Sequence, residues 1–249
     1  MSAPYLTGFS ETPAEITLDS LPIQGSFPDW LFGSLVRNGP GTFHVGKQSY
    51  RHWFDGLAML HKFSFSDGNV SYANKYLQSK SYKTALESGQ ISYSEFATDP
   101  CRSLFARAMS TFFPKITDSA KVNVVRIAEH YMALAETPIQ VEFDIDTLKT
   151  VGVFNYEKRI VGQMTTVHPQ FDFSTGDVFN VVTRYHALSH YNIYQINSSG
   201  ASRRVGSVPV AMRKRSAVSV DSRSAPFTIR PFPPVKEASP DTTSTPLRR

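Results

Sequence analysis

The 249-residue sequence contains a single cysteine, Cys101, and no long apolar run. One cysteine can form neither an internal disulfide nor a zinc site built from cysteines. No stretch approaches the roughly 20 apolar residues of a membrane-spanning helix, and the first residues lack the basic and apolar regions of a secretion signal. We therefore expect a protein of the reducing cytoplasm, not an exported or membrane-spanning one.

The motifs of several common enzyme classes are absent too. The sequence has no glycine-rich phosphate loop that ends in Lys-Ser or Lys-Thr, no Gly-x-Ser-x-Gly and no His-Glu-x-x-His. Familiar nucleotide and hydrolase chemistry is therefore not supported.

The positive charge is concentrated near the C-terminus. The formal net charge is +5, yet ten of the 26 Lys and Arg and only three of the 21 Asp and Glu lie from residue 203 onward, so residues 1–202 are slightly acidic. A basic tail can bind nucleic acid or anionic lipid, but this one has no Tyr or Trp between its charges. We therefore favour a solvated tail and expect no nucleic-acid partner.

The composition of the chain changes near residue 208. Seven of the 16 prolines lie between Pro209 and Pro246. Proline removes a backbone donor and resists helix formation, so this segment is poorly suited to extend a sheet. We predict an ordered domain over residues 1–208 and a disordered tail, rich in Ser, Pro and Arg, over residues 209–249.

The ordered part is predicted to be all-β. Its short apolar runs are rich in β-branched and aromatic residues and are separated by turn signals. The clearest hairpin joins residues 57–65 to 70–77, because Asp67-Gly68 supplies the positive φ angles of a tight turn. Five more segments have the length and composition of strands: 122–127, 131–135, 139–143, 178–183 and 191–196. Such a meander is typical of a propeller, barrel or sandwich.

One segment breaks this pattern and predicts a short amphipathic helix over residues 103–113. Its apolar side chains recur at helical spacing: Leu104, Phe105, Ala108, Met109, Phe112 and Phe113. Two interpretations stay open. The apolar face packs on the sheet, or it dips into a bilayer with Arg102, Arg107 and Lys115 near the headgroups.

His168 is the histidine whose surroundings suggest a metal ligand. Pro169 follows it directly and favours an extended backbone at His168, which lets the ring point in one direction. One imidazole alone does not hold an iron or zinc ion. The other six histidines are interpreted as ordinary surface or core residues: His44, His52, His61, His130, His186 and His190.

Several motifs, in order and at matching spacing, resemble those of the carotenoid cleavage oxygenases, a family that includes carotenoid and apocarotenoid dioxygenases and the retinoid isomerohydrolase of the eye. They lie in residues 30–43, 52–61, 133–137 with 146–150, and 167–172. The resemblance covers about residues 10 to 208, which would be the N-terminal part of a family member.

The resemblance implies a partial seven-bladed β-propeller, about its first four blades, with non-haem Fe(II) bound on the axis by four histidines. His168 matches the first of these iron ligands, and Glu136 matches one of the glutamates that orient ligand histidines. A carboxylate that accepts the N–H of an imidazole fixes its tautomer and strengthens it as a donor. On its own, Glu136 would be interpreted as a surface carboxylate at a turn.

The family resemblance also implies the substrates and a membrane contact. The expected substrates are O₂ and a lipophilic polyene, a carotenoid or apocarotenoid, in which one double bond is cleaved to two carbonyl products. The family places an apolar helical insertion beside the membrane, and residues 98–105 with the helix after them resemble it. The implied peripheral contact residues are Leu104, Phe105, Met109, Phe112 and Phe113.

The sequence departs from the family after residue 208. The family segment Tyr-x-His-Ser-Phe-Gly, which carries the second ligand, is absent, and no histidine follows His190. With one ligand of four, the chain alone is expected neither to retain iron nor to cleave carotenoids. Two hypotheses stay open: an iron(II) dioxygenase, or an inactive, truncated or frameshifted propeller fragment that acts, if at all, as an interaction module. No catalytic residue is assigned.

Overall fold

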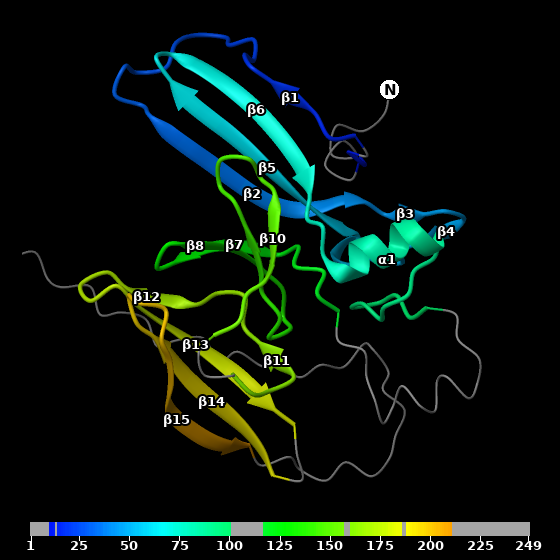
Figure 1. Cartoon of the computed structure of the whole chain (residues 1–249), viewed down its shortest axis with the longest axis vertical. Coiled ribbons are helices and arrows are strands. Elements are labelled where there is room, and N and C mark those ends of the chain that lie inside the picture. The colour runs from blue at the N-terminus through cyan, green and yellow to red at the C-terminus, as the bar shows by residue number, and fades with distance from the viewer. Residues whose placement is uncertain (1–9, 13, 101–116, 157–159, 186–187, 211–249) are drawn as a thin grey trace, which may run out of the picture. The chain divides into compact units, whose positions relative to one another are not determined.

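The computed structural model describes residues 10–12, 14–100, 117–156, 160–185 and 188–210 (Figure 1). These residues form antiparallel β-sheets and one short α-helix. The all-β prediction is therefore confirmed in its main feature.

The first sheet contains the predicted hairpin. Its strands, in spatial order, are β1 (Thr17–Leu18), β6 (Asn69–Tyr76), β5 (Leu57–Ser66) and β2 (Gly33–Thr42). The turn between β5 and β6 has φ angles of 51° at Asp67 and 72° at Gly68, which explains why Asp-Gly marks this hairpin. A small two-stranded sheet, β3 (His44–Val45) with β4 (Gln48–Ser49), follows β2 in the chain.

Two further sheets come from the second half of the described chain. The second sheet has the order β10 (Thr150–Val153), β9 (Val141–Phe143), β8 (His130–Leu134) and β7 (Asn123–Ile127). The third has the order β11 (Met164–Thr165), β13 (Asp177–Arg184), β14 (Ser189–Ile196) and β15 (Ser202–Val210), and β12 (Gln170–Asp172) also pairs with β13.

The five additional predicted strands correspond to β7, β8, β9, β13 and β14. Each predicted end lies within two residues of the observed one. Strand β15 ends at Val210, and residues 211–249 of the predicted tail lie outside the described residues.

The helix α1 (Lys80–Ser88) was not predicted. The side chain of Ser79 caps it by accepting the Tyr82 N–H at 3.2 Å, and Gly89 ends it in the left-handed conformation. The carboxylate of Asp118 accepts the amides of Lys80 and Ser81 and so occupies the helix N-terminus. The helix predicted over 103–113 lies outside the described residues. Among the described residues, no helix is long and apolar enough to cross a membrane.

Strand β8 places apolar side chains on both faces of the second sheet. Met132 and Leu134 belong to a core shared with the third sheet through Val178 and Ile196. Ala133, on the opposite face, belongs to a core shared with the first sheet. The alternation follows from the two-residue period of a strand, so both faces of this sheet are covered.

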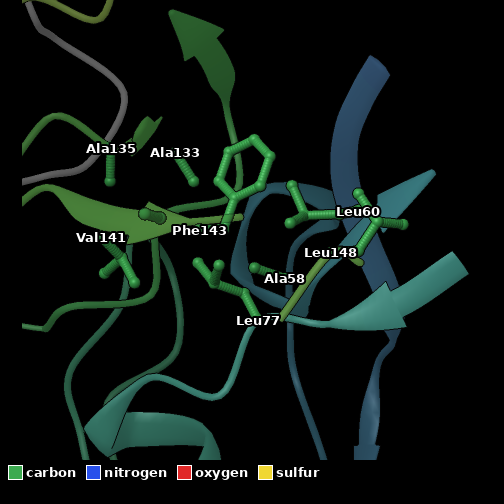
Figure 2. Packing of buried hydrophobic residues seen from close by; sticks show 9 residues of the cluster. Ala58, Leu60, Leu77, Ala133, Ala135, Val141, Phe143 and Leu148 are labelled. Carbon is green, nitrogen blue, oxygen red and sulfur yellow. The ribbon is translucent and has the colours of Figure 1, made fainter. Parts of the chain in front are cut away.

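The core between the first and second sheets combines small and large side chains (Figure 2). Leu60 lies in β5, and Leu77 directly follows β6 of the same sheet. Phe143 ends β9, and Leu148 lies between β9 and β10 of the second sheet. All four are almost fully buried. The other labelled members are the smaller residues Ala58, Ala133, Ala135 and Val141.

Strand β5 alternates in the same way as β8. Ala58 and Leu60 face the second sheet, whereas Leu57 and Met59 pack with Ala85 of α1 in a third cluster. The helix therefore covers the opposite face of β5. Each fully buried aliphatic side chain in these clusters contributes about 1.5–3 kcal/mol through removal of apolar surface from water.

The segment before β1 is tied to the first sheet and its neighbours. Thr12 donates its amide to the Gly41 carbonyl at 2.8 Å. The carboxylate of Glu11 accepts the Phe43 amide at 2.5 Å and contacts the His44 ring at 2.7 Å. Burial opposes the charged form of Glu11, but the hydrogen bonds from Phe43, His44 and Thr42 outweigh it and hold the pKa of this carboxyl below its usual value.

We expect Gly56→Ala to destabilise the protein. A Cβ at this position would lie 2.6 Å from Pro40 Cβ and 2.7 Å from the Thr42 carbonyl oxygen, so β2 would have to move. The expected loss is about 1–3 kcal/mol in the free energy of unfolding, measured by denaturant titration. Gly39→Ala is the matched control, because nothing lies within 4 Å of its Cβ. Equal losses in the two variants would contradict the close approach.

We expect Glu11→Gln to change how stability depends on pH. A lowered carboxyl pKa stabilises the folded state above the unfolded-state pKa, and this contribution is lost as the pH falls through the folded-state pKa. The difference in unfolding free energy between wild type and variant should therefore be largest near neutral pH and vanish in acid. A Glu129→Gln control, at an exposed surface pair with Arg126, should show little difference at any pH.

Candidate functional site

The main chain at His168 is held firmly, while its ring is exposed. His168 lies between β11 and β12, and both of its chain neighbours, Val167 and Pro169, are buried. Its N–H donates to Thr166 Oγ1 at 3.0 Å, and its carbonyl accepts Gln170 Nε2 at 3.2 Å. The backbone therefore fixes the point from which the imidazole projects.

Asparagine side chains hold the two carbonyls before His168. Asn123 Nδ2, on β7 of the second sheet, donates to the Val167 carbonyl at 2.7 Å. Asn180 Nδ2, on β13, donates to the Thr166 carbonyl at 3.1 Å. The segment is thus tied to two sheets at once.

Glu136 lies just after β8 and is linked to the same segment through the main chain. Its carbonyl accepts the Thr165 amide at 2.9 Å, three residues before His168. Its own side chain is exposed, and within the described chain no hydrogen bond joins its carboxylate to the His168 ring. The structure therefore brings the two predicted site residues into one region without pairing their side chains.

The other described histidines have hydrogen-bond partners of their own. Four of them bond through Nδ1 to a side-chain or main-chain oxygen, and His52 accepts the Phe54 amide. The four pairs are His44 with Glu11, His61 with Tyr72, His130 with Glu142 and His190 with the Leu188 carbonyl. Burial, followed by the charge of Arg37, lowers the pKa of His61. His186 lies outside the described residues.

The described donors do not make a complete iron site. In the parts of the chain that the structure covers, no group of three or more His, Cys, Asp and Glu side chains converges. The exposed His168 ring suits the role of one donor, but iron affinity requires several donors held in one geometry. The residues present therefore fit part of a metal site and not the whole of one.

A cavity of about 450 Å³ opens beside the first sheet. Its wall includes Asn38 and His61 together with the aromatic rings of Phe43, Trp53 and Phe54. His168 does not line it. Asn38 links this wall to the second sheet, because its Nδ2 donates to the Asn123 carbonyl of β7 at 3.3 Å as well as to the Ala120 carbonyl at 2.8 Å.

Exposed aromatic rings gather next to this cavity. Phe54 packs edge to face on Phe96 with ring centroids 5.7 Å apart, and Trp53 stacks on Phe54 at 5.9 Å. These three side chains are 54%, 68% and 49% exposed for Phe54, Phe96 and Trp53. A cluster of exposed aromatic side chains of this kind marks a candidate binding region.

A buried charge network lies behind the aromatic rings. Lys121 Nζ donates to Glu95 Oε2 at 2.6 Å, and the two side chains are only 6% and 4% exposed. Lys121 also donates to the Asp55 carbonyl, and the fully buried Asp55 carboxylate accepts the Thr98 hydroxyl at 2.7 Å. Burial raises the pKa of the Glu95 carboxyl, and the ammonium of Lys121 opposes that rise.

This network was not predicted from the sequence. Its members lie up to 66 residues apart in the chain, and each looks like an ordinary surface charge by composition. The fold alone brings them together.

Comparison with known proteins identifies relatives over most of the chain. The family model described as "Retinal pigment epithelial membrane protein" (RPE65) matches residues 9–228. The mitochondrial carotenoid-cleaving dioxygenase of Mustela putorius furo is 42% identical over 201 residues, 78% of this chain and 36% of that protein. The beta,beta-carotene 15,15'-dioxygenase of Gallus gallus is 39% identical over 186 residues, 71% of this chain and 35% of that protein.

Solved structures show a similar fold. A cobalt-substituted apocarotenoid oxygenase of Synechocystis superposes with a TM-score of 0.71 at 23% identity, over 82% of this chain and 44% of that one. At this identity the likeness concerns the fold alone. The chain spans about a third of the length of the curated relatives it matches.

We expect Lys121→Met to destabilise the fold strongly, because it leaves the Glu95 carboxylate buried without a partner. Removal of one partner of a buried ion pair costs about 3–5 kcal/mol. A raised Glu95 pKa means that stability is lost as the pH rises through it, so the deficit should shrink in acid, where Glu95 is protonated. Denaturant titration from pH 4 to pH 8 measures this.

The matched control combines Lys121→Met with Glu95→Gln. Because no charge is then left buried at this pair, part of the stability should return at neutral pH. A single variant whose deficit is small and independent of pH would contradict the buried ion pair.

Proposed function

We propose, because this chain belongs to the RPE65 family of carotenoid cleavage oxygenases, that it forms the N-terminal part of a seven-bladed β-propeller whose axis carries non-haem Fe(II). In this proposal the described sheets belong to about the first four blades, and a tail follows the propeller part after Val210, the last residue of β15, two residues later than the boundary at 208 predicted from the sequence.

The proposed reaction is the oxidative cleavage of one carbon–carbon double bond of a carotenoid or apocarotenoid. Both atoms of O₂ enter the products, one on each carbon of the broken bond, which gives two carbonyl compounds and needs no further reductant. The iron, when bound, supplies the chemistry that brings O₂ to reaction. This chain supplies His168 as one iron donor and Glu136 as a carboxylate that accepts the N–H of a ligand imidazole.

The observation that carries the proposal is the state of the His168 ring. Of the histidines that the structure describes, the others bond to protein groups, whereas the His168 ring has no hydrogen-bond partner within the described residues. Its main chain is nevertheless bonded on both sides. A fixed backbone with an exposed ring is what a donor to an ion outside these residues requires.

The exposed rings of Trp53, Phe54 and Phe96 support an apolar substrate. A polyene presents a flat, apolar face that packs well on aromatic rings. The predicted membrane contacts, Leu104, Phe105, Met109, Phe112 and Phe113, lie outside the described residues and remain part of the proposal.

The test of the proposal is a titration with cobalt(II), followed through the histidine ring signals in NMR spectra. We expect the His168 ring to shift or broaden as cobalt is added, because neither of its ring nitrogens has a hydrogen-bond partner among the described residues. His44 and His130 contact carboxylates through Nδ1 and keep Nε2 as a donor, so His44→Ala and His130→Ala should leave the response of the His168 ring unchanged. A His168 ring that does not respond to cobalt would remove the assignment of His168.

A second candidate function is favoured by the incomplete donor set. With no converging group of three donors among the described residues, the chain by itself would be an inactive fragment that acts through its surfaces. We expect anaerobic loading with Fe(II) and desalting to leave far less than one iron per chain. A coloured apocarotenoid mixed with this material should keep its visible absorbance. Close to one iron per chain, or bleaching that depends on the protein, would show a complete catalyst instead.

A further inference from the structure

We propose that Asn123 is a positioning residue for His168: from β7 in one sheet it fixes the main chain that carries the imidazole in the next. The inference rests on the proposed function, in which His168 donates to iron. It goes beyond that function because it identifies what holds the donor in place.

Both ends of the Asn123 amide are used. Its Nδ2 donates to the Val167 carbonyl at 2.7 Å, across 44 residues of sequence. Its Oδ1 accepts the amide of the next residue, Val124, at 2.8 Å. The bond to Val124 fixes the plane of the side-chain amide. One N–H of its NH₂ group then points at the carbonyl of the peptide bond that joins Val167 to His168.

The remaining polar groups of this segment also hold its main chain in place. Asn180 Nδ2 holds the Thr166 carbonyl at 3.1 Å, and the Thr166 hydroxyl accepts the His168 N–H at 3.0 Å. Val167 is only 4% exposed. Rotation of the ring about its own bonds is then the main freedom that His168 retains. A metal donor benefits from this, since productive sites hold their donors to within roughly 0.5 Å.

The same hydrogen bond, from the amide of a valine to the side-chain oxygen of the asparagine before it, occurs at two places. Asn180 Oδ1 accepts the Val181 amide at 2.7 Å, as Asn123 does with Val124, and each asparagine begins an Asn-Val-Val triplet. Both asparagines donate to the segment before His168. The repetition indicates that the two residues act on one target from two strands.

Asn74 provides a matched control. It is buried, its Oδ1 accepts the Ile16 amide at 2.6 Å, and its Nδ2 donates to the Ala14 carbonyl at 3.1 Å. It therefore bonds to two main-chain groups in the same way as Asn123, and neither group belongs to Asn123 or to the segment before His168. A variant of Asn74 removes a hydrogen bond of the same kind elsewhere in the fold.

The experiment compares Asn123→Asp with Asn74→Asp in the full chain without metal. Aspartate keeps the Oδ1 acceptor for the Val124 amide and removes the Nδ2 donor. We expect Asn123→Asp to speed hydrogen exchange of the His168 amide by about tenfold or more, as the loss of one buried hydrogen bond allows. The His168 ring should also gain mobility in ¹⁵N relaxation. Asn74→Asp should leave both quantities at their wild-type values.

Thr166→Val provides a second variant if Asn123→Asp does not fold. It removes the hydroxyl that accepts the His168 amide and should produce the same local loosening. Unchanged His168 exchange in Asn123→Asp, or equal changes in the Asn74 and Asn123 variants, would overturn the positioning role.

A cobalt(II) titration of the wild type separates this inference from the proposed function. If hydrogen exchange of the His168 amide responds to Asn123→Asp but cobalt does not perturb the ring, Asn123 does position the His168 main chain and the metal-donor assignment of His168 fails. If cobalt perturbs the ring and exchange does not respond, the donor assignment stands and the positioning inference fails.

Discussion

Burial of the second sheet on both faces is the constraint on which the other contacts depend. Strand β8 directs Ala133 into one core and Met132 with Leu134 into the other. A slip of one residue in its register would exchange the two sets, placing large side chains where small ones now allow close approach. The register therefore also sets where Glu136 meets Thr165 and where Asn123, on the neighbouring strand, meets Val167.

Much of the strand pattern could be predicted because its causes are local. Asp67-Gly68 fixes a turn whatever surrounds it, and runs such as Val178–Thr183 have both the composition and the length of a strand. Strand β2 was not among the predicted strands, and its Gly39, Pro40 and Gly41 are residues of low β-propensity. It is a strand because β5 pairs with it along its length, with a bulge between Pro40 and Thr42. Tertiary pairing here overrides local propensity.

In the candidate site, too, local features could be predicted and long-range contacts could not. A motif was enough to single out His168 and Glu136, because each lies in a short recognisable segment. The hydrogen bonds that hold them could not be foreseen, since they join residues whose separation in the chain carries no signal. Asn123 looks like the start of an ordinary strand, and only the packing of two sheets shows that its amide reaches Val167. The buried pair of Lys121 and Glu95 is hidden for the same reason.

The helix α1 depends on a contact with a residue that lies far along the chain. Its nine residues fall short of the roughly 12 to 15 that an isolated helix needs in water. Its first amides are satisfied by Asp118, which follows Lys80 by 38 positions in the chain. During synthesis on a ribosome, this helix would therefore emerge with its Ser79 cap but without the Asp118 carboxylate at its first amides, which arrives only after residue 118 has left the exit tunnel. Until then, the apolar side of β5 that the helix covers would be open to chaperones.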